Sequence, residues 1–315
     1  MRKVIHFVPK AKSIRFFQNI KRDLKEMFGE DLYSIHWKPS AFIEELNKRK
    51  DKLDVIIISA HGSNDSIIKL NNGREPSKLI TLEEAHLFRN NFIFANSCYT
   101  ANKFGPALIE NGALCYIGFN HLMSEVFKYK NKSNHLLFEK VVKRIYTDSI
   151  SQAISDFINK CLTAKELCQY IEFYFKKHIN VVCKMSLAVL NEEYDTKLDE
   201  EDHQIFKLAK LELLEKFNDL KDRLNILGEE NYIFWSEINK LSSMKLKQLQ
   251  KKVEQIKNPL YKNFLKMIIC IHLDDQENYR RAVQEFMIIV EKYEYEFIIP
   301  FDISKDFNQV KLMVN

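Results

Sequence analysis

The sequence predicts an α/β fold: a mostly parallel sheet sandwiched by helices, followed by a carboxy-terminal all-α segment. In the first half of the 315-residue chain, short apolar runs alternate with stretches of helical periodicity. The apolar runs are rich in β-branched and aromatic residues, which is typical of strands buried on both faces. From about Ser133 onward only helical periodicity remains. Repeated strand–helix–strand order also favours right-handed crossovers and therefore parallel strands.

The first elements lie close to the amino terminus. We expect a buried strand from Lys3 to Val8, because this run is mostly apolar and Pro9 closes it. Ser13 is placed to cap the following helix, and Gly29 to end it. The apolar positions of that helix keep helical spacing: Ile14, Phe17, Ile20, Leu24 and Phe28.

Strands and helices continue to alternate up to residue 119. A strand over 32–37 precedes a helix over 40–46 that Ser40 caps. The Asn71-Asn72-Gly73 sequence predicts a tight turn that joins two short strands in a hairpin. The remaining predicted elements are strands over 54–60, 66–70, 78–80, 91–97 and 114–119 and a helix over 107–110.

An acidic segment at 195–202 marks the expected boundary between two domains. Residues 1–195 then form the α/β domain, and residues 203–315 form a helical domain suited to binding a regulatory protein partner. One helical stripe there contains Phe206, Leu213, Phe217, Leu220 and Leu224. A helical pair is predicted over 261–273 and 276–293.

Composition narrows the classes of partner. The net charge of +5 is mild and the charges are interleaved, so direct nucleic-acid binding is not expected. No apolar run approaches the length of a membrane span, and the amino terminus does not read as a signal peptide. Six cysteines without regular spacing suggest reduced thiols in a cytoplasmic protein. No glycine-rich phosphate loop follows a predicted strand, so a nucleotide cofactor is not expected. A metal is not expected either, because the cysteine chemistry considered below does not require one.

Two predicted strands each end on a residue that cysteine hydrolases need. One run leads directly into His61-Gly62, and the other leads into Cys98. If the strands are neighbours, the imidazole can take the thiol proton, because the carboxyl ends of parallel strands open onto one crevice. The backbone N–H groups of Cys98 and Gly62 are candidate donors for an oxyanion. A lone cysteine is more often a buried structural thiol, and only its pairing with His61 favours catalysis.

These residues resemble a known family. The segments around His61-Gly62 and Asn96-Ser97-Cys98-Tyr99-Thr100-Ala101 look like those of the caspase-fold cysteine peptidases, most closely the bacterial CHAT family. The run from Phe104 to Gly118 is similar to the next helix, Gly-Ala turn and strand of that family. The resemblance covers roughly the first 190 residues, a span compatible with one domain. It implies a thiol endopeptidase with His61 as base and Cys98 as nucleophile, acting on a protein or peptide substrate.

The resemblance also implies where the substrate binds. A substrate strand would pair with the segment after Gly118, which contains Phe119 and Asn120. For the side chain before the cut, Asp65 and Glu125 would favour Lys or Arg, whereas Arg15 would favour an acidic residue. The sequence does not choose between these alternatives. Asn96 is a further candidate to contact the substrate; alternatively, it would tune the thiol or simply satisfy backbone groups.

Other classes of function stay open from the sequence. His121 and Glu125 have the spacing of a metal pair but lack a further ligand. One alternative hypothesis is that the α/β domain is a catalytically silent scaffold that binds a partner. Another is that Cys98 catalyses an acyl transfer other than peptide hydrolysis. CHAT-like proteins are often paired with sensor modules, so the resemblance implies activation by a partner in bacterial stress response or anti-phage defence.

Overall fold

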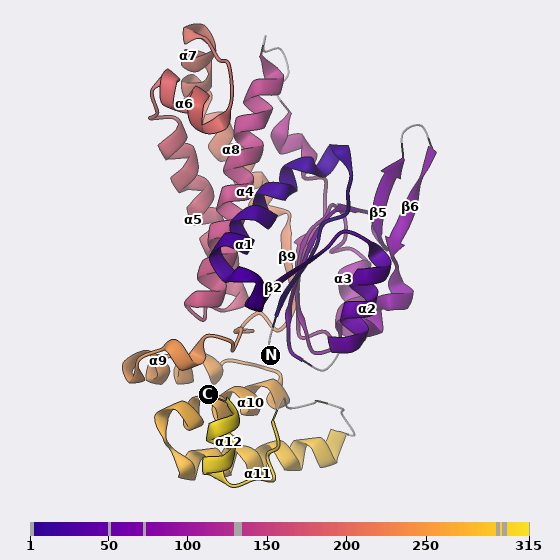
Figure 1. The fold of residues 1–315 in the computed structure, drawn as a ribbon, viewed down its shortest axis with the longest axis vertical. Helices are drawn as coiled ribbons and strands as arrows, with labels where there is room; N and C mark the ends of the chain where they lie inside the picture. The colour runs from indigo at the N-terminus through magenta and orange to yellow at the C-terminus, as the bar shows by residue number, and fades with distance from the viewer. Residues whose placement is uncertain are drawn as a thin grey trace.

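A six-stranded, mostly parallel sheet lies at the centre of the molecule (Figure 1). The computed structural model describes residues 3–49, 52–71, 74–128, 134–293, 297 and 301–314. The strand order is β2-β1-β3-β7-β8-β9, and all neighbours are parallel except β8 and β9. The strands are β1 Val4–Phe7, β2 Tyr33–His36, β3 Val55–Ser59, β7 Phe92–Asn96, β8 Cys115–Phe119 and β9 Leu224–Gly228. The predicted α/β class is confirmed.

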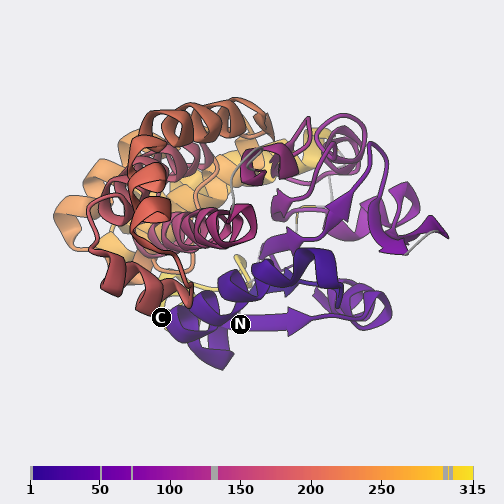
Figure 2. The same cartoon turned by 90° about the horizontal axis from the view of Figure 1, so that it is seen from above.

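Helices cover both faces of this sheet. Along β3, Val55 and Ile57 belong to one apolar cluster and Ile56 and Ile58 to the other, because successive strand residues point to opposite faces. The first cluster also contains side chains of α1 (Gln18–Leu32), α4 (His135–Asn159) and α5 (Ala164–Val182). The second contains side chains of α2 (Pro39–Arg49) and α3 (Phe104–Glu110). In Figure 2 the magenta-to-orange helices gather on one side, beside the indigo and purple strands.

Two predicted helix starts are wrong. Ser13 lies inside a 3-10 turn, η1 (Lys12–Phe17), and therefore does not cap a helix. Ser40 lies inside α2, which begins at Pro39, since proline fits the first turn of a helix. Gly29 was predicted to end the first helix; its φ of +67° does break the helical path, but α1 continues past it to Leu32.

A second, smaller sheet follows β3 directly. It contains β4 (His61–Gly62), β5 (Ile67–Asn71) and β6 (Arg74–Ile80) in that order, all antiparallel. The predicted hairpin is thus confirmed as β5 and β6, although residues 72 and 73 of its turn lie outside the described residues. This sheet fixes the backbone of His61 and Gly62 immediately beyond the central sheet.

The last strand of the central sheet comes from a segment that the sequence assigns to helices. The chain leaves α8 (Lys210–Asp222) at Arg223 and forms β9, which pairs antiparallel with β8. The prediction that Leu224 continues the helical stripe is therefore wrong, although Leu213, Phe217 and Leu220 are buried as expected. Residues 203–315 are not all helical, and the division into two domains stays a prediction.

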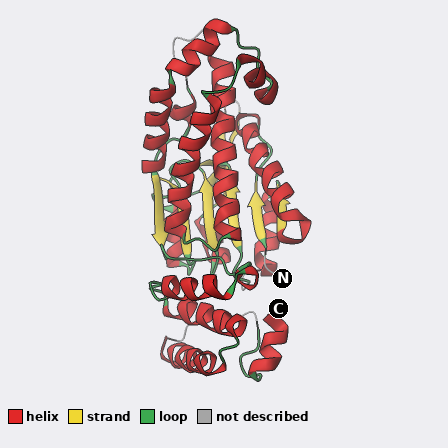
Figure 3. Ribbon diagram, turned by 90° about the vertical axis from the view of Figure 1, so that its left-hand side faces the viewer, coloured by secondary structure: helices red, strands yellow, loops and turns green. Residues whose placement is uncertain are grey.

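The carboxy-terminal helices lie below the sheet (Figure 3). The predicted pair is confirmed as α10 (Pro259–Leu273) and α11 (Gln276–Tyr293). The other helices are α6 Leu187–Tyr194, α7 Glu200–Leu208, α9 Ser243–Val253 and α12 Phe307–Val314. Across the part of the chain that the structure describes, no helix has the length and apolar character needed to cross a membrane.

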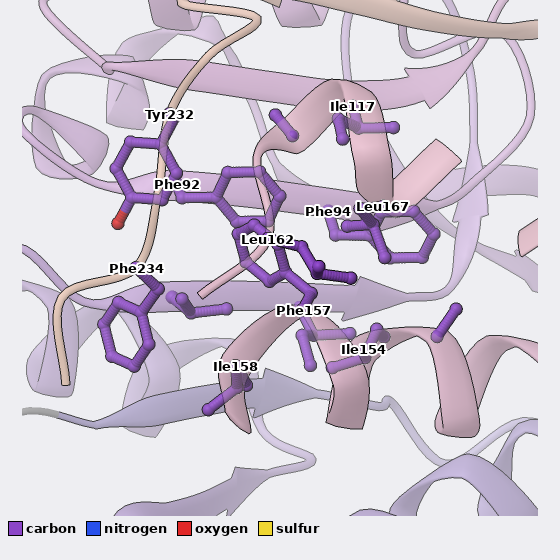
Figure 4. Packing of buried hydrophobic residues seen from close by; sticks show 14 of the residues in the cluster. Phe92, Phe94, Ile117, Ile154, Phe157, Ile158, Leu162, Leu167, Tyr232 and Phe234 are labelled. Carbon is purple, nitrogen blue, oxygen red and sulfur yellow. The ribbon is translucent and has the colours of Figure 1, made fainter. Parts of the chain in front are cut away.

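An aromatic stack joins the sheet to these helices. Phe92 of β7 packs on Phe157 of α4, with ring centroids 4.8 Å apart, and on Tyr232, at 5.1 Å (Figure 4). Tyr232 in turn stacks on Tyr261 of α10 at 5.0 Å and 6° between planes. The Tyr261 hydroxyl donates to the Ile233 carbonyl at 2.5 Å. The core is therefore continuous from the sheet into α10.

Candidate active site

The ends of β3 and β7 bring the predicted pair together. The two strands are parallel neighbours, with Ser59 opposite Asn96. Ala60 N–H donates to the Asn96 carbonyl at 3.3 Å, and the Ser97 hydroxyl donates to the Ala60 carbonyl at 3.0 Å. His61 and Cys98 each follow two residues after the last paired position, so they lie side by side at the same edge of the sheet.

Gly62 packs directly against the backbone of Cys98. A Cβ at residue 62 would lie 2.5 Å from the Cys98 carbonyl oxygen and 2.6 Å from Cγ2 of Thr100. Only glycine allows this approach without a shift of the backbone. The next turn is also tight, because Tyr99 adopts a left-handed φ of +62°. Gly62 therefore lies against the main chain of Cys98, although it does not line the cavity described below, and its role as an oxyanion donor stays a prediction.

The Cys98 thiol is largely covered by the segment around Met123. Met123 N–H approaches Sγ at 3.3 Å. Burial raises the pKa of Cys98; N–H groups of Met123, Ser124 and Cys98 itself and the charge of Arg223 act in the opposite direction. Cys98 is thus a neutral thiol in this structure. If it loses its proton, the thiolate is already surrounded by main-chain N–H donors.

His61 is held by a residue that is distant in sequence. Its Nε2 lies 2.6 Å from the Ser13 hydroxyl. Burial lowers the pKa of His61, so the ring is neutral at physiological pH and one nitrogen is a proton acceptor. Within the described residues, no hydrogen bond joins this ring to Cys98. The resting pair is a neutral imidazole and a neutral thiol.

Both residues line one cavity of about 180 Å³. Its walls come from η1, from the ends of β3 and β7, from the 3-10 turn η3 (Ser124–Phe127) and from α4. The lining residues are Ser13, Ile14, Phe16, Phe17, Ala60, His61, Asn96, Cys98, Met123, Ser124, Phe127, Lys128, Glu139 and Lys143. A small, partly enclosed space beside a nucleophile and a base is the expected setting for a reacting group.

A buried polar chain lies behind the cavity. Tyr146 donates to Oδ1 of Asn96 at 2.6 Å, and the Asn96 amide donates to the Ser59 hydroxyl at 3.1 Å. Ser59 contacts Nε2 of His6 at 2.8 Å, and Nδ1 of His6 contacts the Tyr33 hydroxyl at 2.5 Å. The chain fixes Asn96, which lines the cavity, and satisfies polar groups that would otherwise be costly to bury.

The three charged candidates for reading a substrate side chain do not line this cavity. Asp65 accepts hydrogen bonds from Ser63, Ser66 and Lys78, and the bond from Lys78 is the main reason its pKa falls to about 2. Glu125 is exposed and lies 3.4 Å from Arg223. Arg15 lines a separate groove of about 710 Å³ that borders α1 and α4. The structure therefore brings none of them to Cys98.

The predicted pairing of substrate with the segment after Gly118 does not hold in this structure. Phe119 is opposite Leu224 of β9, and the Phe119 carbonyl accepts the Ala101 N–H at 3.1 Å. Asn120 N–H donates to the Arg223 carbonyl at 3.0 Å, and its own carbonyl accepts the Asn102 amide. The main-chain groups that a substrate strand would use are already occupied, because β9 fills that side of β8.

Sequence reasoning missed four residues around the site. Ser13 contacts His61, Met123 covers Cys98, and Tyr146 holds Asn96. The Arg223 guanidinium donates to the Leu122 carbonyl at 2.5 Å and so fixes the segment over the thiol. These contacts span 25 to 101 residues along the chain and have no local pattern that would reveal them.

His121 and Glu125 do not form part of a metal centre in the part of the molecule that is described. No group of three or more His, Cys, Asp or Glu side chains there is arranged to hold an ion. The His121 ring instead lies 6.2 Å from the ring of Tyr99. All six cysteines are free thiols.

Neither a protein-family model nor a curated protein sequence matches the chain.

Proposed function

We propose that the protein is a cysteine endopeptidase with a caspase-like fold, similar to the CHAT peptidases. His61 acts as base and Cys98 as nucleophile. One observation carries the proposal: a thiol and an imidazole, at the ends of adjacent parallel strands, line the same small cavity. The sequence resemblance around both residues supports the same assignment.

The reaction uses groups that this chain supplies. As Sγ of Cys98 attacks the substrate carbonyl, its proton passes to the free nitrogen of His61. The backbone N–H groups of Cys98 and Gly62 stabilise the oxyanion. When the C–N bond breaks, the leaving amine takes the proton from His61, and a thioester remains on Cys98. Water, deprotonated by His61, then releases the carboxylic acid and restores the thiol.

The proposed mechanism starts from neutral groups. Burial raises the pKa of Cys98 and lowers that of His61, so both effects oppose a resting thiolate–imidazolium pair. Proton transfer therefore accompanies the binding of substrate or a change at the site. This fits activation by a protein partner, which we assign to the helices after residue 203, and the setting of bacterial stress response or anti-phage defence that the resemblance implies.

Replacement of Cys98 by Ala tests the endopeptidase directly. Expression of the protein with a library of bacterial polypeptides, followed by mass spectrometry of new termini, should give fragments that disappear in the variant. His61→Ala should lower their yield at least about 1,000-fold, as for other bases in covalent catalysis. Cys183→Ala is a matched control, since Cys183 is also a half-buried free thiol but does not line the cavity. Fragments that persist in Cys98→Ala contradict the proposal.

A catalytically silent scaffold is the second candidate. It is favoured by the absence, among the described contacts, of a hydrogen bond between Cys98 and His61, and by the raised pKa of Cys98. Iodoacetamide labelling separates the two. A peptidase in its activated state should label at Cys98 far faster than at the other five cysteines below about pH 8.5, the ordinary pKa of a cysteine. Uniformly slow labelling under all conditions favours the scaffold.

A further inference from the structure

The cavity at Cys98 has an apolar wall. The side chains of Ile14, Phe16, Phe17, Met123 and Phe127 line it, and apart from the partly buried Phe16 they are almost wholly buried. Tyr146 closes the region behind them, because its ring contacts Phe127 at 5.4 Å and Phe16 at 6.4 Å between centroids. Whatever enters beside Sγ therefore meets hydrocarbon and aromatic surface.

Charges at this cavity are few and lie on the α4 and η3 side. Lys143 forms an ion pair with Glu139 at 3.3 Å, and its Nζ also lies over the Phe16 ring at 5.6 Å. Lys128 is exposed to solvent. The Asn96 amide, one of the polar groups that line the cavity, is engaged by Tyr146 and Ser59. A charged group pushed into the cavity would therefore lose its water beside Lys143 and Glu139, whose charges already neutralise each other, and this exchange is costly.

We propose that this cavity is the specificity pocket of the enzyme and takes an uncharged, apolar side chain from the substrate residue whose carbonyl Cys98 attacks. The proposal rests on the endopeptidase function above and names its substrate class. A cavity of about 180 Å³ suits a branched aliphatic or single-ring side chain, since apolar cavities of roughly 150 Å³ hold benzene. This pocket does not favour cleavage after Lys or Arg, which Asp65 or Glu125 would favour, or after an acidic residue, which Arg15 would favour.

Alkylation of Cys98 tests the pocket without requiring peptide-bond cleavage. The full-length protein is treated with N-benzyliodoacetamide, iodoacetamide and iodoacetate, and each rate at Cys98 is divided by the rate with glutathione. The benzyl reagent should react at least about tenfold faster than iodoacetate, a ratio worth only ~1.4 kcal/mol. Equal or faster reaction with iodoacetate, or no reaction of Cys98 with any reagent, overturns the proposal.

Two variants connect the preference to the cavity wall. Phe127→Glu should abolish the preference for the benzyl reagent. Phe173→Glu is the matched control: Phe173 is an exposed aromatic on α5 that does not line the cavity, so the ratio should stay at the wild-type value. A benzyl preference that survives Phe127→Glu contradicts the assignment.

Peptide probes then test the apolar pocket and the endopeptidase activity independently of each other. Peptidyl acyloxymethyl ketones with Leu, Phe, Arg or Asp next to the reactive group should form an adduct at Cys98 fastest with Leu or Phe. Faster reaction with Arg or Asp overturns the apolar pocket and leaves the endopeptidase in place. A benzyl preference without cleavage of any peptide, in the presence of lysate from the host, overturns the endopeptidase and leaves the apolar cavity.

Discussion

Two single residues near the site, His6 and Gly62, are tightly fixed by their surroundings. His6 is fully buried in the sheet, with both ring nitrogens engaged by Tyr33 and Ser59. Burial, with a smaller contribution from the charge of Lys21, lowers the pKa of His6 to about 3. Gly62 touches the backbone of the nucleophile itself. His6 therefore makes the stability of the fold depend on pH, and Gly62 fixes the shape of the backbone beside Cys98.

His6 should make the folded state sensitive to acid. Unfolded chains bind the histidine proton near pH 6.5, whereas the folded protein binds it only near pH 3, so stability falls as pH drops through that window. At about 1.4 kcal/mol per unit, His6 accounts for a loss of roughly 2–3 kcal/mol between pH 6.5 and 4.5. Urea unfolding at pH 6.5 and 4.5 measures the free energy of unfolding. Its decrease between the two pH values should be smaller in His6→Gln than in the wild type. The control variant His86→Gln, at an exposed position, should keep the wild-type pH dependence of this free energy. An unchanged pH dependence in His6→Gln contradicts the role given to His6.

Gly62→Ala should damage the site and the fold together. The new Cβ meets the Cys98 carbonyl at 2.5 Å, so the backbone must shift, at a cost of about 1–3 kcal/mol. We expect at least a tenfold drop in alkylation of Cys98 by N-benzyliodoacetamide, a change equal to only about 1.4 kcal/mol. Gly228→Ala is the control, because it also clashes with a carbonyl, at Leu114, but at the opposite end of β8. Alkylation of Cys98 at the wild-type rate in Gly62→Ala would contradict the prediction.

At the scale of elements, the segment from Asn120 to Phe127 acts as a cover over Cys98. Its Met123 N–H contacts the thiol. Arg223, between α8 and β9, holds it at two points: the guanidinium binds the Leu122 carbonyl, and the Arg223 carbonyl accepts the Asn120 N–H. The position of the cover therefore depends on how α8 and β9 sit against the sheet.

Removal of the Arg223 side chain should uncover the thiol. A hydrogen bond from a charged donor contributes about 1.5 kcal/mol, so Arg223→Ala should speed alkylation of Cys98 by roughly tenfold. The loss of a nearby positive charge acts against this, but burial is the larger influence on the pKa of Cys98. Lys221→Ala, on α8 and paired with Asp222, is the matched control. Slower or unchanged labelling in Arg223→Ala means that the segment does not depend on this contact.

Individual elements show what the sequence could and could not predict. The strands before His61 and Cys98 were predictable, because continuous β-branched and aromatic runs leave few alternatives. The strand β9 was not, since Leu224 continues the helical spacing of Phe217 and Leu220 and the strand is only half-buried. The pairing of His61 with Cys98 was predicted only on the condition that the two strands are neighbours, and the structure meets this condition. The apolar wall did not, because Phe16, Met123 and Phe127 come together only through tertiary contacts.

At the scale of the whole molecule, the aromatic stack makes the sheet and the carboxy-terminal helices one packed body. Phe157, Phe92, Tyr232 and Tyr261 follow one another at centroid distances of 4.8 to 5.1 Å. Tyr261 is fully buried. A shared core of this kind favours a single cooperative transition on heating.

Tyr261→Ala should therefore destabilise the entire protein. Loss of a buried aromatic ring costs about 3–5 kcal/mol, and calorimetry should show one transition that moves to lower temperature as a whole. Tyr261→Phe keeps the ring and loses only the bond to the Ile233 carbonyl, so its shift should be much smaller. Two separate transitions, of which only one moves, would instead indicate that α10 and its neighbours unfold independently.

The antiparallel strand β9 has a consequence for synthesis on the ribosome. Its partner β8 ends at Phe119, and β9 begins only at Leu224. The intervening stretch of roughly 100 residues takes about 5–20 s to translate. During that interval the nascent chain has its nucleophile but neither the strand that borders β8 nor the arginine that anchors the cover. A growing chain therefore exposes an open sheet edge that chaperones can recognise, and the thiol acquires its final surroundings only late in translation.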